Sequence, residues 1–184
     1  MDAANSKFVT YPVTSQRWPD LAALFETPGP RGGRQDTANC WCAVWRWPMR
    51  SPESNKEALR SLVHGGEHTG LLAYRDDQPV EWVSVAPREQ FARLLRTSQF
   101  KPKDEDTGGF VISCFAVDRT THGHGIGRAL VDATVRYALD AGATAVEAYP
   151  GEPTDYKGKL DWFLDYGFEA TRTVGKRTIV RFTP

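Results

Sequence analysis

The chain has 184 residues, with 23 basic and 23 acidic side chains and a formal net charge of +0. A hydrophobic share of 40% and a charged share of 25% are typical of a globular protein, and the length favours one domain that spans residues 1–184. The balanced charge argues against broad nucleic-acid binding, which needs a basic face to neutralise phosphates.

Short strands and helices are predicted for the first third of the chain. A strand is expected around Phe8–Val13, and Ser15 is a suitable N-cap for a helix that reaches Phe25. Residues 28–35 are rich in proline and glycine and predict a loop, which would lie over a site rather than at a domain boundary.

Residues 39–47, which contain three tryptophans, predict a strand. With a period of two, Trp41, Ala43, Trp45 and Trp47 would share one face. Pro48 would end this strand. Ser51 or Ser54 would then cap a helix that stops at Gly65–Gly66.

The rest of the chain predicts hairpins around one strand–helix–strand unit. Residues 71–85 form a hairpin with a turn at 76–79, and a short helix at 87–95 and a polar loop at 97–109 follow. The later elements are a strand at 110–117, a helix to 139, a strand at 145–149, a helix at 159–166 and a hairpin at 169–182. A right-handed crossover would make the strands at 110–117 and 145–149 parallel, within a mixed sheet flanked by helices.

Three cysteines, Cys40, Cys42 and Cys114, leave one over after any pairing, which favours a reducing compartment. The N-terminal residues lack the basic head and apolar run of a signal peptide, and no stretch approaches the roughly 20 apolar residues of a membrane helix. We therefore expect a cytoplasmic protein without a membrane partner.

A glycine-rich turn follows the strand at 110–117 and opens directly into a helix. Its sequence is His122-Gly123-His124-Gly125-Ile126-Gly127-Arg128. Such a turn exposes backbone N–H groups at a helix N-terminus, where the helix dipole also favours a phosphate or pyrophosphate. The dinucleotide-binding fold is disfavoured as an explanation, because there the motif opens the domain and has a third glycine where this chain has Ala129 or Arg128.

The turn resembles motif A of the GNAT superfamily, the acetyl-CoA-dependent N-acetyltransferases, whose pattern is Gln/Arg-x-x-Gly-x-Gly/Ala after a strand. His122 stands where the family has Gln or Arg. The ending Phe163-Leu-Asp-Tyr-Gly167-Phe168 is similar to the family's aromatic-x-x-x-Gly-Phe signature. The resemblance covers residues 69–184 closely and residues 1–68 by general order, and a tryptophan-rich stretch like this one also occurs in an uncharacterised bacterial GNAT subgroup.

The resemblance implies a mixed, mostly antiparallel α/β sheet flanked by helices, with splayed central parallel strands. It also implies direct transfer of an acetyl group from acetyl-CoA, as co-substrate, to a primary amine. The cofactor-binding positions carried over are Phe115, Ala116 and Val117 on the splayed strand, His122, Gly123, His124, Gly125, Ile126, Gly127 and Arg128 in the turn, and Phe163.

The catalytic residues are less clear, because the family's usual general acid, a tyrosine, is Phe163 here, and phenylalanine cannot donate a proton. Tyr156 is our preferred substitute because it precedes the last helix, and Tyr149 is the alternative. For the base we consider Glu147 and Glu81, each acting through water.

The acceptor side is predicted from the tryptophan-rich stretch. Trp41, Trp45 and Arg46 suit a pocket for a small acceptor with a carboxylate or aromatic part, and Glu81 is included with them. Core is the favoured interpretation of the same indoles, and the acceptor pocket is the alternative to it. No acidic docking surface can be inferred, which favours a small molecule over a protein as the acceptor.

Metal binding is not expected. His64-Gly-Gly-Glu67-His68 spells a zinc motif, but two adjacent glycines cost about 1 kcal/mol each in a helix interior, and the pattern lies at a predicted helix stop. The alternative function is a non-catalytic acyl-CoA-binding regulatory module, since Phe163 replaces the tyrosine. Acetylation of charged transfer RNA is disfavoured by the neutral charge, and a homodimer stays open.

Overall fold

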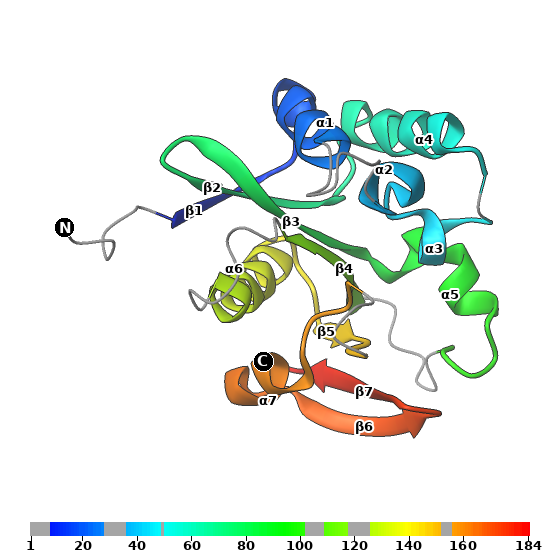
Figure 1. The fold of residues 1–184 in the computed structure, drawn as a ribbon. Helices are drawn as coiled ribbons and strands as arrows, with labels where there is room; N and C mark the ends of the chain where they lie inside the picture. Colours follow the sequence, from blue (N-terminus) through cyan, green and yellow to red (C-terminus); the bar gives the residue numbers. More distant parts are fainter. Residues whose placement is uncertain (1–7, 28–35, 49, 102–108, 118–125, 152–155) are drawn as a thin grey trace.

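The computed structural model describes residues 8–27, 36–48, 50–101, 109–117, 126–151 and 156–184. A seven-stranded sheet in the order β1-β2-β3-β4-β5-β7-β6 carries helices on both faces (Figure 1). The strands are β1 (Phe8–Pro12), β2 (Gly70–Arg75), β3 (Gln78–Pro87), β4 (Gly109–Val117), β5 (Ala145–Ala148), β6 (Glu169–Val174) and β7 (Arg177–Phe182). The helices are α1 (Trp18–Glu26), α2 (Asp36–Cys40), α3 (Ala43–Arg46), α4 (Pro52–His64), α5 (Ala92–Arg96), α6 (Ile126–Asp140) and α7 (Leu160–Tyr166).

The predicted mixed sheet is confirmed. β4 and β5 are parallel, whereas the pairs β1–β2, β2–β3, β3–β4, β5–β7 and β6–β7 are antiparallel. The turn between β2 and β3 is built by Asp76 and Asp77, both with positive φ (49° and 62°), which suits the right-handed twist of a tight hairpin. None of the described helices is both long and apolar enough to cross a membrane.

The two central parallel strands separate after four residue pairs. Their pairing begins at Gly109 with Ala145 and ends at Ile112 with Ala148. β4 continues alone on this side to Val117, while its other edge stays paired with β3. The register with β3 shifts between Ser84 and Val85, so that Ser113 is an extra residue in β4. The second half of β4 therefore has one edge without a neighbouring strand, and this edge is called the free edge of β4 below.

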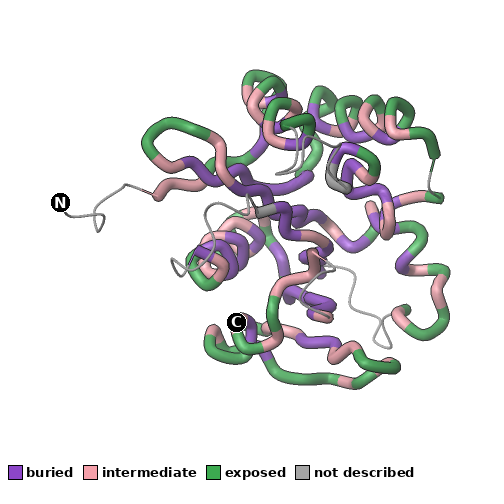
Figure 2. Tube along the Cα trace, in the orientation of Figure 1, coloured by how far each residue is buried: buried purple, intermediate pink, exposed green. Residues whose placement is uncertain are grey.

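Apolar side chains fill both faces of the sheet, and buried positions gather in the central strands and on the inward faces of the helices (Figure 2). On one face Leu130, Val131 and Val135 of α6 pack in one cluster with Val83 and Val85 of β3. On the other face the cluster contains Leu21, Phe25, Trp41, Leu59, Leu72 and Trp82. The two faces are thus built by different parts of the chain.

The predicted strand at 39–47 is wrong. α2 ends at Cys40, Trp41 and Cys42 take positive φ (46° and 56°), and α3 follows. The tryptophans point in different directions because each meets its own partner. Trp41 packs 4.9 Å from Phe25 between ring centroids, whereas the indole nitrogen of Trp47 donates to Asn55 Oδ1 at 3.2 Å.

Helix α4 begins and ends as predicted. Ser51 is its N-cap, and its side chain accepts a hydrogen bond from the backbone N–H of Ser54 at 3.2 Å. Gly65 is the C-cap and Gly66 takes a positive φ of 78°, which glycine adopts at little cost. This glycine pair ends the helix, so the zinc-like pattern at 64–68 does not lie on one helical face.

Candidate active site

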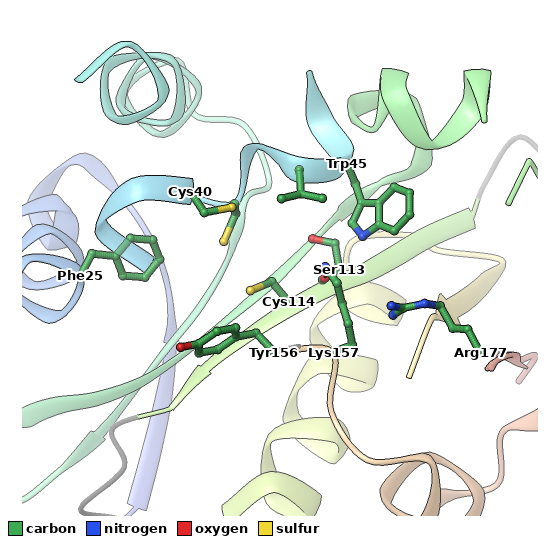
Figure 3. A pocket seen from close by; sticks show the side chains of 10 residues that line it. Phe25, Cys40, Trp45, Ser113, Cys114, Tyr156, Lys157 and Arg177 are labelled. Atoms are coloured by element: carbon green, nitrogen blue, oxygen red, sulfur yellow. Dashed lines mark hydrogen bonds between the residues drawn. The ribbon is translucent and has the colours of Figure 1, made fainter. Parts of the chain in front are cut away.

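A pocket of about 390 Å³ lies where β4 has lost its β5 neighbour (Figure 3). Its described lining residues are Phe25, Cys40, Cys42, Val44, Trp45, Ser113, Cys114, Tyr156, Lys157 and Arg177. This volume is within the range of small-molecule sites. The pocket is therefore the first candidate for a binding site on this chain.

Strand β4 separates the pocket from the face that carries α6 and α7. Cys114 lines the pocket, whereas the next residue, Phe115, packs against Trp162 and Phe163 of α7, with ring centroids 6.0 Å apart in both pairs. Alternation along a strand explains this division. The pocket and the α6–α7 face thus meet at the backbone of residues 113–117.

The segment that precedes α7 lies against the free edge of β4. The backbone N–H of Phe115 donates to the Tyr156 carbonyl at 2.7 Å, and Lys157 Nζ donates to the Ser113 carbonyl at 2.6 Å. Tyr156 has a φ of 58°, a conformation uncommon for a residue with a side chain. Tyr156 and Lys157 thus take the place that β5 holds farther down the strand.

A buried polar chain runs under the pocket from Arg46. Its guanidinium donates to Ser84 Oγ at 3.3 Å, to the Thr69 carbonyl at 3.1 Å and to Gln90 Oε1 at 2.5 Å. Ser84 and Ser113 share a hydrogen bond of 2.9 Å between their hydroxyls. Burial lowers the pKa of Arg46 to about 10, because desolvation penalises the charged form. Arg46 thus supports the floor of the pocket without lining it.

All three cysteines of the chain line the pocket. Burial raises the pKa of Cys40, and a hydrogen bond with Cys114 together with burial raises the pKa of Cys42. Neutral thiols are poor nucleophiles. Among the described residues, no group of three or more His, Cys, Asp or Glu is placed to hold a metal ion.

Glu147 and Tyr149 form a separate polar cluster. Glu147 Oε1 lies 3.1 Å from Arg88 Nη2 and 3.4 Å from Arg181 Nη1, and its other oxygen accepts from the Tyr149 hydroxyl at 3.0 Å. Burial, followed by the Glu147 carboxylate, raises the pKa of Tyr149 well above its usual range. Both side chains are therefore engaged with one another and with arginines, and neither is among the described residues that line the pocket.

Some of the predicted cofactor residues lie in the described part of the chain and others do not. The residues from His122 to Gly125 lie outside the described part of the chain, and so does the Val117 side chain. Ala116 faces the cluster that contains Trp82. Ile126 begins α6 and is 7% exposed, while Phe163 is fully buried beside Phe115.

Gly127 and Arg128 both join α6 to α7. A Cβ at Gly127 would lie only 2.4 Å from Trp162 Cη2, so the close approach of the indole requires glycine there. The Arg128 guanidinium contacts Asp165 at 2.6 Å and Asp161 at 3.1 Å. The sequence did not predict these packing roles, because both partners lie more than thirty residues away.

The four predicted acceptor residues do not form one wall. Trp45 lines the pocket, whereas Trp41 is fully buried in the core beside Phe25. Glu81 is buried and shares its face of β3 with Val83, which packs towards α6 on the opposite face from the pocket. Of these four residues, Trp45 alone lines the pocket, and Arg46 lies beneath the pocket floor.

Three residues of the pocket were missed or given other roles in the sequence. Arg177 opens the last strand and reaches the pocket across the sheet, which no local pattern indicates. Ser113 is the extra residue of a bulge that depends on pairing with β3. Val44 was assigned to a strand. Each of these signals is tertiary, so periodicity along the chain could not show it.

Comparisons with known proteins agree with this architecture. The sequence model of the Acetyltransferase (GNAT) family matches residues 35–156, more than half of the 184 residues. A search of curated proteins finds no match. Among solved structures, the GNAT domain of S. lividans PAT has a TM-score of 0.61 and 15% identity, and the alignment covers 100% of this chain and 99% of that one.

Two further structures were solved with a cofactor. Aminoglycoside acetyltransferase AAC(6')-Ib, in complex with coenzyme A, has a TM-score of 0.62 and 15% identity, with 96% of this chain and 95% of that one covered. The protein yncA from Salmonella typhimurium, with its cofactor acetyl-CoA, has a TM-score of 0.58 and 12% identity, with 97% and 94% covered. At these identities the likeness shows the fold, and the family match shows the relationship. The chain belongs to the GNAT family of acetyltransferases.

Proposed function

We propose that this protein is an acetyl-CoA-dependent N-acetyltransferase that moves an acetyl group directly to a primary amine of a small molecule. The observation that carries the proposal is the free edge of β4 after Ile112, which lies beside a pocket lined largely by apolar side chains. A thioester on one side of this edge and an amine on the other would be held in line for transfer.

The residues present fit acetyl-CoA. The 15-residue helix α6 follows β4 and has no acidic side chain in its first turn, so its dipole and N-terminal N–H groups favour a pyrophosphate. The backbone of residues 113–117 would hold the pantetheine arm, whose thioester supplies the acetyl group. Because the Tyr156 carbonyl already accepts from the Phe115 N–H, we expect cofactor binding to displace this contact.

Among the tyrosines considered, we propose Tyr156 as the general acid. It lines the pocket and its carbonyl touches the free edge of β4, whereas the Tyr149 hydroxyl is held by Glu147. We therefore assign protonation of the leaving thiolate to Tyr156. This protonation is needed because a thiolate expelled into an apolar site is poorly solvated.

Neither predicted base is among the described residues that line the pocket. Glu147 is held between Arg88 and Arg181, and Glu81 lies on the opposite face of the sheet. We propose that the amine loses its proton to solvent.

A thiol-release assay with acetyl-CoA and a panel of small primary amines tests the proposal. We expect turnover with at least one amine and a fall of about 10²-fold in kcat for Tyr156→Phe, with unchanged affinity for acetyl-CoA. Tyr11→Phe on the exposed strand β1 is the matched control and should turn over like the wild type. Unchanged turnover in Tyr156→Phe would remove this residue as the acid.

The regulatory-module alternative keeps one observation in its favour, which is the fully buried Phe163 at the position of the family's usual acid. An acyl-CoA-binding module would bind acetyl-CoA but release no thiol with any amine. Acetyl-CoA binding in calorimetry, together with no thiol release for any amine of the panel, would therefore favour the module over the enzyme.

A further inference from the structure

Three nitrogen-bearing side chains meet at one end of the pocket. Lys157 Nζ lies 5.5 Å from the centroid of the Trp45 ring, and Arg177 lines the same space from the start of β7. Figure 3 shows the indole nitrogen of Trp45 turned towards the side where Lys157 lies and the Arg177 guanidinium directed towards Lys157. This group, Trp45, Lys157 and Arg177, is called the cationic end below.

The cationic end is built for a hydrogen-bond acceptor. Trp45 Nε1 is buried and has no hydrogen-bond partner among the described residues, and a buried N–H without a partner is costly. Arg177 Nη1 donates to the Tyr149 carbonyl at 2.9 Å, and Lys157 donates to the Ser113 carbonyl at 2.6 Å. These backbone bonds fix both cations in place, and an arginine has five N–H donors and a lysine three.

The charges of the residues that line the pocket also favour a hydrogen-bond acceptor, and specifically an anion. Among the described residues that line the pocket, two are cationic and none is acidic. An anion bound at this end of the partly desolvated pocket would interact favourably with both positive charges. A guanidinium fork and an indole N–H suit the two oxygens of a carboxylate.

The rest of the pocket lining is mostly apolar. It includes Phe25 and Val44 together with Cys40, Cys42 and Cys114. Burial raises the pKa of Cys40, and the hydrogen bond with Cys114 together with burial raises the pKa of Cys42, so both thiols stay neutral. A ligand that fills the pocket therefore needs an apolar body beside its anionic group.

The position of the cationic end sets the distance between the carboxylate and the amine. Lys157 Nζ lies 2.6 Å from the carbonyl of Ser113, on the free edge of β4 where the amine would react. The carboxylate must therefore be close to the amino group. We propose that the acceptor is an apolar amino acid, bound through its carboxylate by Trp45, Lys157 and Arg177; this inference rests on the proposed acetyl transfer.

Matched amines test this inference in the thiol-release assay with the full chain. Leucine and phenylalanine are compared with their decarboxylated amines, their amides and the corresponding aminophosphonates. We expect the amino acids to have a kcat/KM about 10- to 100-fold higher than the decarboxylated amines, as a charge-assisted hydrogen bond would give. Equal or better turnover of the decarboxylated amine would overturn the carboxylate site while leaving acetyl transfer intact, and better turnover of the phosphonate would overturn the choice of carboxylate.

Variants locate the site. Arg177→Met should lower kcat/KM for the amino acid about 10-fold and leave the decarboxylated amine unchanged, whereas Arg177→Lys should retain part of the preference. Arg136→Met, at an exposed position on α6, is the control and should behave like the wild type. An equal loss for both amines in Arg177→Met would indicate a structural role and contradict the proposal.

Calorimetry separates this proposal from the proposed function. We expect leucine or phenylalanine to bind the protein loaded with coenzyme A, and Arg177→Met to weaken that binding. This binding without any turnover would support the site and contradict the enzyme. The absence of binding for both amino acids, together with turnover of other amines, would contradict the site alone.

Discussion

Gly127 provides a test of how α6 and α7 are joined. The three atoms closest to a Cβ at this position belong to the six-membered ring of Trp162, at 2.4, 2.5 and 2.6 Å. A rigid ring cannot yield by bending, so Gly127→Ala must move the indole or the helix. Alanine is better than glycine in a helix by up to about 1 kcal/mol, but overpacking typically costs about 1–3 kcal/mol. We therefore expect a net loss of about 1–2 kcal/mol in the free energy of unfolding.

Chemical denaturation of a double-mutant cycle measures this contact. Gly127→Ala combined with Trp162→Leu should lose less stability than the sum of the two single changes, because the smaller side chain leaves space for the methyl group. A Gly127→Ala protein as stable as the wild type, or strictly additive effects, would refute the reasoning. Calorimetry with acetyl-CoA then separates the roles. If Gly127→Ala weakens acetyl-CoA binding, recovery of the affinity in the double variant would assign Gly127 to packing. An affinity that stays low in the double variant would assign Gly127 to the cofactor turn.

Three further predictions concern Glu147, Cys114 and Tyr137. Glu147→Gln should lower the free energy of unfolding by about 3 kcal/mol, because it leaves the buried Arg88 without its carboxylate; a change below about 0.5 kcal/mol in denaturation would contradict the structural role. Cys114→Ala should keep most of the turnover, since direct transfer needs no thiol, and complete loss in the thiol-release assay would indicate a covalent intermediate. Burial raises the pKa of Tyr137 to about 12, so its contribution to the free energy of unfolding should be fully present below about pH 10 and should be lost as the pH rises towards 12. In denaturation experiments, the free energy of unfolding of Tyr137→Phe should fall less over this pH range than that of the wild type. An identical fall in both proteins would exclude Tyr137 as the cause.

Local patterns predicted those elements that are specified by their own residues. The helix after Ser51 has a cap, an apolar stripe and a glycine stop, and it forms as α4. The turn at Asp76 and Asp77 fixes the hairpin of β2 and β3. The parallel pair of β4 and β5 follows from the handedness of crossover connections.

Other features depend on contacts that no local pattern contains. Trp41 and Trp45 lie four positions apart, a spacing that suits a helix as well as a strand. In the structure Trp41 lies between two short helices, α2 and α3, and packs against Phe25 in the core. The sequence assigns Gly127 only to a phosphate-binding turn, but the close approach of Trp162 also requires a glycine at this position. Arg177 reaches the pocket only because β7 pairs with β5. The full lining of the pocket was therefore beyond prediction, although the strand that supports it and two lining residues, Trp45 and Tyr156, were named from the sequence.

A crystal structure with coenzyme A bound tests the central claim most directly, because that claim places acetyl transfer at the free edge of β4. The account predicts the coenzyme A sulfur beside Ser113 and Phe115, facing the pocket, with the Tyr156 carbonyl displaced from the Phe115 N–H. A sulfur on the far side of α6, or a coenzyme A bound away from β4 with the Tyr156 contact intact, would contradict it.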